Sequence, residues 1–232
     1  MANAKDIATL EATLGYTFKN KDLLQNALTH SSYANESKVK VSSNERLEFL
    51  GDAVLQIYIS DHLYHTYPDC AEGELTKMRQ FLVCEKTLAE AAQAISLGSY
   101  MLFGKGEGKD GPSKPSVLAD AFEALLAAVY LDSCKDGTAR RLLIHLLSDK
   151  IKQAASAHMD YKTRLQQFVQ QAGNEQLSYV TVSEDGPPHA RIFFVEAKID
   201  GNTMGGGTGH TKREAEQNAA REALRWFKAN LD

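Results

Sequence analysis

The hydrophobic periodicity of this 232-residue chain changes near residue 160, and no other feature constrains the fold as much. Before that point, apolar residues recur with the helical period of about 3.6 residues. The helical stretches are 10–14, 23–28, 47–64, 75–94 and 117–131. After it, the pattern predicts a helix over 161–172, strands over 177–183 and 190–199, a short strand near 202–208 and a helix over 211–228. We therefore expect a mainly α N-terminal domain and an α+β C-terminal domain of order αβββα.

Breaks in these patterns predict the domain boundaries. We expect an N-terminal domain over residues 1–150, a linker over 151–159, where the apolar pattern weakens, and a C-terminal domain over 160–230. Polar or glycine-rich breaks also fall at 34–43 and 104–116. The second break, GKGEGKDGPSKPS, is too rich in Gly, Pro and Lys for regular structure, and we expect a mobile loop there.

Composition excludes several classes of protein. A hydrophobic content of 43% is enough for a core, and three scattered cysteines fit neither a disulfide framework nor a zinc site. The N-terminus lacks a secretory signal, and no apolar stretch approaches the roughly 20 residues of a membrane span. We therefore expect a cytoplasmic protein without a membrane partner. The net charge of −4 comes entirely from residues 1–150, because residues 151–232 carry equal numbers of acidic and basic residues.

Carboxylates are stacked on two of the predicted helices. Glu45, Glu48 and Asp52 are spaced i, i+3 and i+7, and Asp120 and Glu123 are spaced i, i+3, so each set shares one helix face. Like charges at this spacing repel each other, and a hard cation such as Mg²⁺ relieves the repulsion. The pattern predicts a carboxylate metal site that hydrolyses a phosphate ester.

A solvated acidic face is the plain alternative, and neighbouring residues weaken it. Gly51 lies inside the first acidic helix, where it is costly unless another segment approaches closely. Asp120 and Glu123 lie among apolar residues, where carboxylates are rare unless paired or bound to metal. We also expect Ser42 and Glu45 to form an S-x-x-E capping box at the start of the first acidic helix.

In the C-terminal domain, Thr211 and Glu214 predict a capping box, which places Lys212 and Arg213 in the first helical turn. Positive charge there opposes the helix dipole, but a phosphate at the helix N-terminus would turn the conflict into attraction. The glycine run 205–207 either gives the backbone freedom beside phosphates or is merely a turn. The polar face of helix 161–172 fits 2′-hydroxyls, although an ordinary solvated face is equally compatible.

Longer segments carry a resemblance to a known family. NERLEFLGDAVL resembles the signature of bacterial ribonuclease III, and ALTHSSY, EGELTKMR, GKGE and LADAFEAL follow in the family's order. YKTRLQQFVQ and the tail GTGHTKREAEQNAAREAL resemble its double-stranded-RNA-binding domain. The resemblance covers nearly the whole chain.

The resemblance implies a role for each matching residue. Glu48, Asp120 and Glu123 would hold the metal, Asp52 and Glu123 would be most directly needed for cleavage, and Glu45 and Glu72 would assist at a cleft built by a homodimer. Phe49 would pack against the partner subunit. Contacts with RNA are implied for Thr163 and Gln166 in one minor groove, His189 in the next, and Lys212 and Arg213 on the phosphates between them.

The resemblance also implies the reaction. The chain would be a Mg²⁺-dependent endoribonuclease, with Mn²⁺ as a substitute and no organic cofactor. It would cut double-stranded RNA to 5′-phosphate and 3′-hydroxyl ends with short 3′ overhangs, in rRNA precursors and other structured transcripts. Two alternatives remain: a catalytically inactive double-stranded-RNA-binding regulator, and a helical hydrolase of small phosphorylated metabolites.

Overall fold

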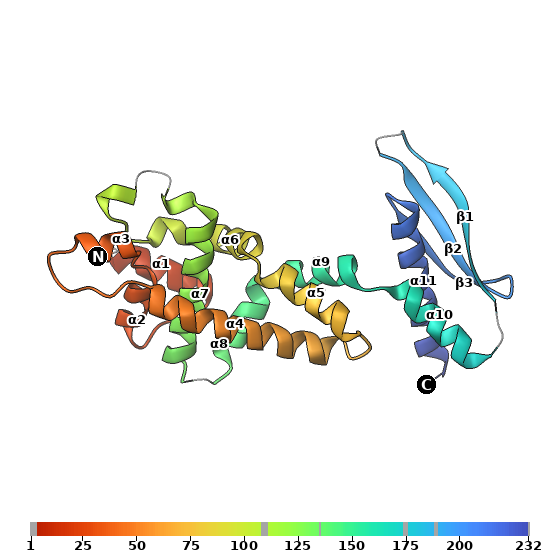
Figure 1. Cartoon of the computed structure of the whole chain (residues 1–232), viewed down its shortest axis with the longest axis horizontal. Helices are drawn as coiled ribbons and strands as arrows, with labels where there is room; N and C mark the ends of the chain where they lie inside the picture. The colour runs from red at the N-terminus through yellow and green to blue at the C-terminus, as the bar shows by residue number, and fades with distance from the viewer. Residues whose placement is uncertain (1–3, 108–110, 135, 174–175, 188–189, 232) are drawn as a thin grey trace. The chain divides into compact units, whose positions relative to one another are not determined.

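The computed structural model describes the whole chain except residues 1–3, 108–110, 135, 174–175, 188–189 and 232. The chain forms two compact units, Met1–His158 and Met159–Asp232. The first unit is helical and the second combines two helices with a three-stranded sheet (Figure 1). This division confirms the predicted fold classes.

The described part of the first unit is built from α-helices joined by short 3-10 turns (Figure 1). The α-helices are α1 (Ala4–Leu14), α2 (Lys21–Ala27), α3 (Ser31–Glu36), α4 (Glu45–Thr66), α5 (Glu72–Val83), α6 (Glu85–Ala94), α7 (Pro115–Asp132), α8 (Thr138–Leu146) and α9 (Ser148–His158). The 3-10 turns are η1 (Leu97–Tyr100), η2 (Lys105–Glu107) and η3 (Gly111–Ser113).

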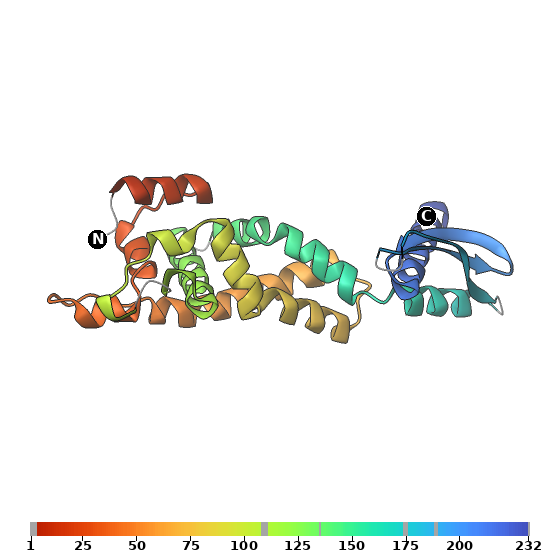
Figure 2. The ribbon, with the colours of Figure 1, turned by 90° about the horizontal axis from the view of Figure 1, so that it is seen from above.

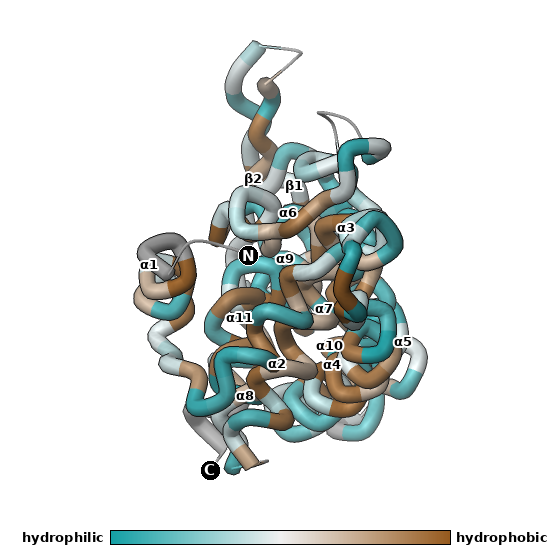
Figure 3. Tube along the Cα trace, turned by 90° about the vertical axis from the view of Figure 1, so that its left-hand side faces the viewer, coloured by the Kyte–Doolittle hydropathy of each residue, from teal (hydrophilic) through white to brown (hydrophobic). Residues whose placement is uncertain are grey.

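Helix α7 lies at the centre of the first unit. Its sequence is apolar on nearly every side, as a helix surrounded by protein requires, and its apolar character can be followed in Figure 3. Pro115 starts the helix at a position where its missing N–H costs nothing. Helices α2, α4, α6 and α8 all pack against α7. The second acidic helix is therefore held from several sides.

The single helix predicted over 75–94 is two helices. α5 ends at Val83, Cys84 has an extended backbone, and α6 begins at Glu85. Thr87 stabilises the break by donating from its hydroxyl to the carbonyl of Phe81 at 2.7 Å. The break lets α5 pack on α4 and α9 while α6 packs on α7. No Gly or Pro marks the position, so the sequence pattern did not reveal it.

Two expectations about connecting segments differ from the structure. Residues 151–158, expected to be linker, continue α9, because Ile151, Ala154 and Ala155 are buried in the first unit. The stretch 104–116 contains η2 and η3, so it is not devoid of regular structure. Glu36 accepts hydrogen bonds from the backbone N–H groups of Lys105 and Gly106, at 2.8 and 3.0 Å.

The second unit has the predicted order αβββα. It contains α10 (Tyr161–Ala172), β1 (Leu177–Asp185), β2 (Ile192–Ile199), β3 (Asn202–Gly209) and α11 (Lys212–Leu231). The strands form an antiparallel sheet in the order β1-β2-β3. Both helices cover one face of the sheet (Figures 1 and 2). The core between the layers includes Leu165, Val169, Val195, Ala197 and Ile199.

Alternate glycines of β3 let α11 lie directly on the strand. A β-carbon on Gly207 would stand 2.2 Å from the backbone nitrogen of Ala219, and one on Gly205 would stand 2.5 Å from that of Ala223. The small side chains of Ala219 and Ala223 complete this close packing. The glycine run therefore serves contact between strand and helix. The expectation of a turn was wrong, because these glycines lie inside strand β3.

Candidate active site and nucleic-acid interface

The first acidic helix is positioned by the segment that precedes it. Asn44, at the start of α4, is buried and donates its backbone N–H to the carbonyl of Thr29 at 2.9 Å. Asn26 donates from its side chain to the carbonyls of Ser42 and Ser43, both at 2.8 Å. The capping box predicted for Ser42 and Glu45 was wrong, because Asn44 is the N-cap residue and no side chain caps the helix. These bonds direct α4 across α7.

Gly51 brings the two acidic helices into backbone contact. A β-carbon at this position would stand 2.0 Å from the backbone oxygen of Glu123 and 2.5 Å from its carbonyl carbon. Any side chain would therefore force α4 away from α7. The expectation that another segment approaches Gly51 closely is confirmed, and that segment carries the second acidic pair.

Close packing of the helices couples their carboxyl groups. Burial raises the pKa of Glu123 to about 7. The charges of Asp52, Asp120 and Glu48 add to this rise, in that order. Burial and the neighbouring negative charges both disfavour the ionised form of Glu123. The structure therefore brings together four carboxyl groups that the sequence had placed on two separate helices.

Neighbouring groups extend the coupling. Burial raises the pKa of Glu48, and the charges of Asp120 and Glu45 add to it. Burial also raises the pKa of Asp120, the charge of Glu85 adds to it, and His30 partly offsets it. Sequence reasoning missed Glu85, the first residue of α6, because the break between α5 and α6 was not foreseen. His30 lies in the ALTHSSY segment, which resembles the family, but no role had been assigned to it.

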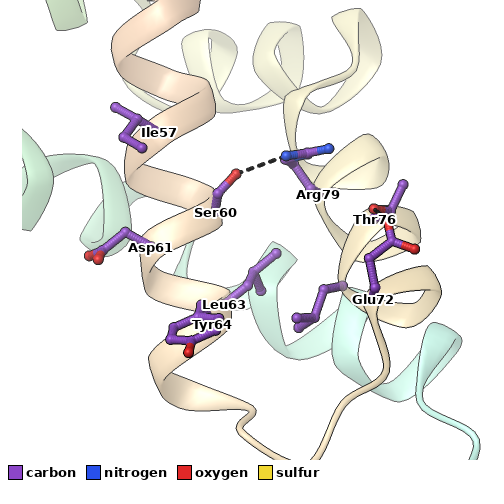
Figure 4. Close-up of a pocket in the computed structure, with 9 residues that line it drawn as sticks. Ile57, Ser60, Asp61, Leu63, Tyr64, Glu72, Thr76 and Arg79 are labelled. Atoms are coloured by element: carbon purple, nitrogen blue, oxygen red, sulfur yellow. Dashed lines mark hydrogen bonds between the residues drawn. The ribbon is translucent and has the colours of Figure 1, made fainter.

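Glu72 lies apart from this cluster. It starts α5, is exposed, and accepts a hydrogen bond from the hydroxyl of Thr76 at 2.8 Å. Figure 4 shows it beside a pocket between α4 and α5, where Arg79 of α5 donates a hydrogen bond to the hydroxyl of Ser60 on α4 at 3.1 Å. Five of the six acids predicted from the sequence thus form one group: Glu45, Glu48, Asp52, Asp120 and Glu123. The sixth, Glu72, lies at the pocket between α4 and α5.

The donor set of the acidic cluster fits a hard divalent cation. Carboxylate oxygens are the ligands that Mg²⁺ and Mn²⁺ prefer, and mutual repulsion among them falls when a cation lies between them. Within the described ranges, no three His, Cys, Asp or Glu side chains already converge closely enough to hold a metal ion. Binding would therefore require the carboxylates to move together by rotation of their side chains.

An exposed apolar stripe runs along the same helix as the first acids. Phe49, Ile57 and Tyr64 on α4 have exposed fractions of 83%, 61% and 68%. Ile57 and Tyr64 also line the pocket between α4 and α5, whose volume is about 420 Å³ (Figure 4). Large apolar side chains in a row on a surface are typical of a protein interface.

In the second unit, the predicted RNA-binding residues gather at one end of the helices. Thr163 and Gln166 are exposed on α10. Lys212 and Arg213 are exposed in the first turn of α11. Burial opposes a lowered pKa at Asp160, the N-cap residue of α10, but hydrogen bonds from Gln217 and Thr163 lower it, and the charge of Arg213 adds a smaller effect in the same direction. His189 lies outside the described residues.

The predicted cap of α11 forms in part. The hydroxyl of Thr211 accepts the backbone N–H of Glu214 at 3.1 Å, as a capping box requires. The Glu214 carboxylate accepts instead from the backbone N–H of His210 at 2.8 Å, one residue earlier than predicted. The helix start therefore lies where the sequence placed it, with both positive charges in its first turn.

Comparisons with known proteins match both units. The model of a family described as Ribonuclease-III-like matches residues 20–151, and that of the double-stranded RNA binding motif matches residues 161–226. Ribonuclease 3 of Oceanobacillus iheyensis is 47% identical over 221 residues, which cover 94% of this chain and 97% of the relative. Ribonuclease 3 of Clostridium tetani is 43% identical over 230 residues, covering 98% and 97%.

Solved structures agree for the first unit. The nuclease domain of ribonuclease III from Campylobacter jejuni, described for flexibility in its region involved in dimer formation, is 41% identical with a TM-score of 0.57. The match covers 62% of this chain and 97% of that domain. Among the helices of the described residues, none is both long enough and apolar enough to cross a membrane.

Proposed function

Because this chain belongs to the ribonuclease III family, we propose that the acidic cluster of α4 and α7 is the site at which it cuts double-stranded RNA. The observation that carries the proposal is the coupling of Glu48, Asp120 and Glu123 across the backbone contact at Gly51. Carboxyl groups whose negative charges repel one another are stabilised by a positive partner when they ionise. A cation that also contacts a phosphodiester meets that need.

Glu48, Asp120 and Glu123 would hold the metal, which we propose to be Mg²⁺, with Mn²⁺ as a substitute. A divalent cation bound there supplies a water of lowered pKa and neutralises charge on the phosphate. Asp52 lies on the exposed side of α4, next to Glu123 in the electrostatic cluster, where it can orient the attacking water. Glu123 has to lose its proton before it can bind a cation, and its raised pKa makes this loss depend on pH.

In the hydrolysis that we propose, the water oxygen bonds to phosphorus and the bond from phosphorus to the 3′ oxygen breaks. The products are a 5′-phosphate and a 3′-hydroxyl. The second unit would bring the duplex to this site through Thr163, Gln166, Lys212 and Arg213, and His189 belongs to the same proposal. A module of this type spans roughly 16 base pairs and reads A-form shape more than sequence.

We further propose that two copies act together through the stripe of Phe49, Ile57 and Tyr64. Glu72 lies beside that stripe and away from the acids of its own chain, which supports a role for it, with Glu45, at a cleft built by both copies. Two such sites, each cutting one strand, would leave short 3′ overhangs. Cytoplasmic rRNA precursors and other structured transcripts are the substrates that the family relationship implies.

The test is a cleavage assay of the full chain on a long, perfectly paired RNA, with Mg²⁺, Mn²⁺, Ca²⁺ or a chelator. We expect cutting in Mg²⁺ and Mn²⁺ and none in the chelator, with single-stranded RNA left intact. Glu123→Gln should still bind the duplex but should cut it at least about 100-fold more slowly. Loss of a metal ligand should cost more than loss of a residue that only supports a ligand, which costs about 10- to 100-fold. Binding without cutting by the unaltered chain in every metal would instead identify an inactive RNA-binding regulator.

A further inference from the structure

In the second unit, the carboxylate of Glu184 forms ion pairs with two basic side chains, Lys212 and Arg191. Glu184, near the end of β1, contacts the ammonium group of Lys212 at 2.9 Å through Oε1. Its other oxygen, Oε2, contacts the guanidinium group of Arg191 at 3.2 Å. Each oxygen of Glu184 thus pairs with a different cation, and the side chain joins the start of α11 to the residue just before β2.

Lys212 is fixed by a second neighbour as well. Its ammonium group lies 5.5 Å from the centre of the Phe193 ring, within the range of a cation–π contact. Phe193 is the residue of β2 that pairs with Glu184 of β1 in the sheet. The paired residues Glu184 and Phe193 therefore hold Lys212 from two sides, and the strand register places them there.

The two cations favour the ionised form of Glu184. The hydrogen bond from Lys212 and the charge of Arg191 keep the pKa of Glu184 below its usual range. The side chain of Lys212 is 57% exposed and that of Arg191 is 45% exposed, so a phosphate can reach both. A phosphate that approaches Lys212 and Arg191 would be repelled by the negative charge of Glu184, which is already paired with both cations.

We propose that Glu184 limits how tightly the second unit binds double-stranded RNA, by holding Lys212 and Arg191 in ion pairs that phosphates must displace or share. The inference rests on the proposed function, since it takes Lys212 to be a phosphate contact. A Lys ammonium has three donors and can serve two acceptors, so the carboxylate weakens the contact without preventing it. Exposed ion pairs are individually weak, which sets the size of the effect.

The test compares Glu184→Gln with the unaltered full chain on a duplex of about 20 base pairs, longer than one module spans. A chelator prevents cutting. Glutamine keeps the shape and removes the charge. We expect binding about two- to fivefold tighter at low salt, as loss of an exposed ion pair allows. The gain should fall as salt rises, because exposed charges are screened.

Glu196→Gln is the matched control. Glu196 is a partly buried carboxylate of β2 in the same unit, and it contacts Lys198 at 3.2 Å and the hydroxyl of Thr203 at 3.1 Å. The substitution Glu196→Gln removes one negative charge, as Glu184→Gln does, but it does not release Lys212 or Arg191. If both variants bound the duplex more tightly by the same factor, the effect would come from net charge alone and the proposal would be overturned.

A double variant tests the route of the effect. In a Lys212→Ala background, Glu184→Gln should gain less than it does alone, because one of the two released cations is missing. Unchanged or weaker binding by Glu184→Gln, with a melting temperature like that of the unaltered chain, would overturn the proposal. Glu184→Ser serves in its place if the glutamine variant melts early. Failure of the unaltered chain to bind the duplex would overturn the proposed function instead.

Discussion

Glu123 shows how folding changes the chemistry of a single residue. In the sequence it is one acid of a helical pair, and in the structure its carboxyl pKa is raised to about 7. Burial is the largest cause, and three neighbouring carboxyl groups add to it. The spacing of acids revealed the pair, but the pKa depends on α4 lying against α7.

The raised pKa predicts how stability depends on pH in the metal-free protein. Between the ordinary glutamate value of 4.5 and about 7, the folded chain binds more protons at Glu123 than the unfolded chain does. The free energy of unfolding therefore falls as pH rises through this window. Glu123→Gln removes that fall, and the variant should be more stable than the unaltered chain at pH 8 by on the order of 1 kcal/mol, after solvent screening of a partly exposed group.

Urea unfolding in a chelator, at several values between pH 5 and pH 8, measures this difference. The two proteins should lie close together near pH 5 and separate towards pH 8. Mg²⁺ added at pH 8 should stabilise the unaltered chain more than the variant, because binding of the cation favours the ionised carboxylates. Parallel pH profiles in the chelator would contradict the role of burial at this residue.

Lys212 carries a second prediction at this scale. Lys212→Ala should weaken binding to duplex RNA of any sequence, by about three- to tenfold, because a phosphate contact does not read bases. The slope of log affinity against log salt should become shallower by about one. Lys198→Ala is the control, since Lys198 is paired with Glu196 within the sheet. An unchanged salt slope for Lys212→Ala would count against a phosphate contact.

At the scale of elements, the contact of α4 with α7 decides whether the acidic cluster exists. Gly51→Ala should destabilise the first unit by about 1–3 kcal/mol or more, because the added carbon would lie 2.0 Å from the backbone of Glu123. The same change should reduce cleavage, since the two acidic faces move apart. Thermal unfolding and the cleavage assay measure the two effects.

Gly73→Ala is the matched control for this element. Gly73 lies in the first turn of α5, and a β-carbon there would meet nothing within 4 Å. Alanine favours helix over glycine by up to about 1 kcal/mol, so this variant should be as stable as the unaltered chain or more so. Equal behaviour of the two glycine variants would mean that close packing at Gly51 is unimportant.

The strand β3 and the helix α11 show the limit of motif reading at this scale. Three consecutive glycines near basic residues had two sequence interpretations, a turn or backbone freedom beside phosphates, and neither anticipated the packing of these glycines against α11. Gly205 and Gly207 point at the backbone of α11, at Ala223 and Ala219, and only a glycine fits there. The spacing of alanines in α11 matches the alternation of glycines in β3, but a pairing between two separate elements is not visible within either one.

At the scale of the whole molecule, the exposed stripe of α4 predicts a dimer. The unaltered chain should sediment as a dimer at micromolar concentration, because Phe49, Ile57 and Tyr64 form a row of exposed apolar side chains. Phe49→Asp should raise the dissociation constant at least about tenfold, since an unpaired charge would be buried in the interface. Analytical ultracentrifugation across a range of concentrations measures it.

Val182→Asp provides the control, because Val182 is 52% exposed but lies on β1 of the second unit. It should leave the dimer intact. Cleavage of both strands should fall with Phe49→Asp to the extent that dimers are lost. A chain that stays monomeric without substitution would contradict the two-site arrangement.

The sequence alone determined the two fold classes, the order αβββα, the positions of most helices and strands and the two acidic helix faces. Each of these depends on residues close together in the chain, through helical or strand periodicity. The tertiary structure decided the break at Cys84, the helical course of 148–158, the neighbours Glu85 and His30 of Asp120, and the separation of Glu72 from the other acids. These features depend on which elements pack together, and that packing is set by side chains far apart in the chain, as at Gly51 and Glu123.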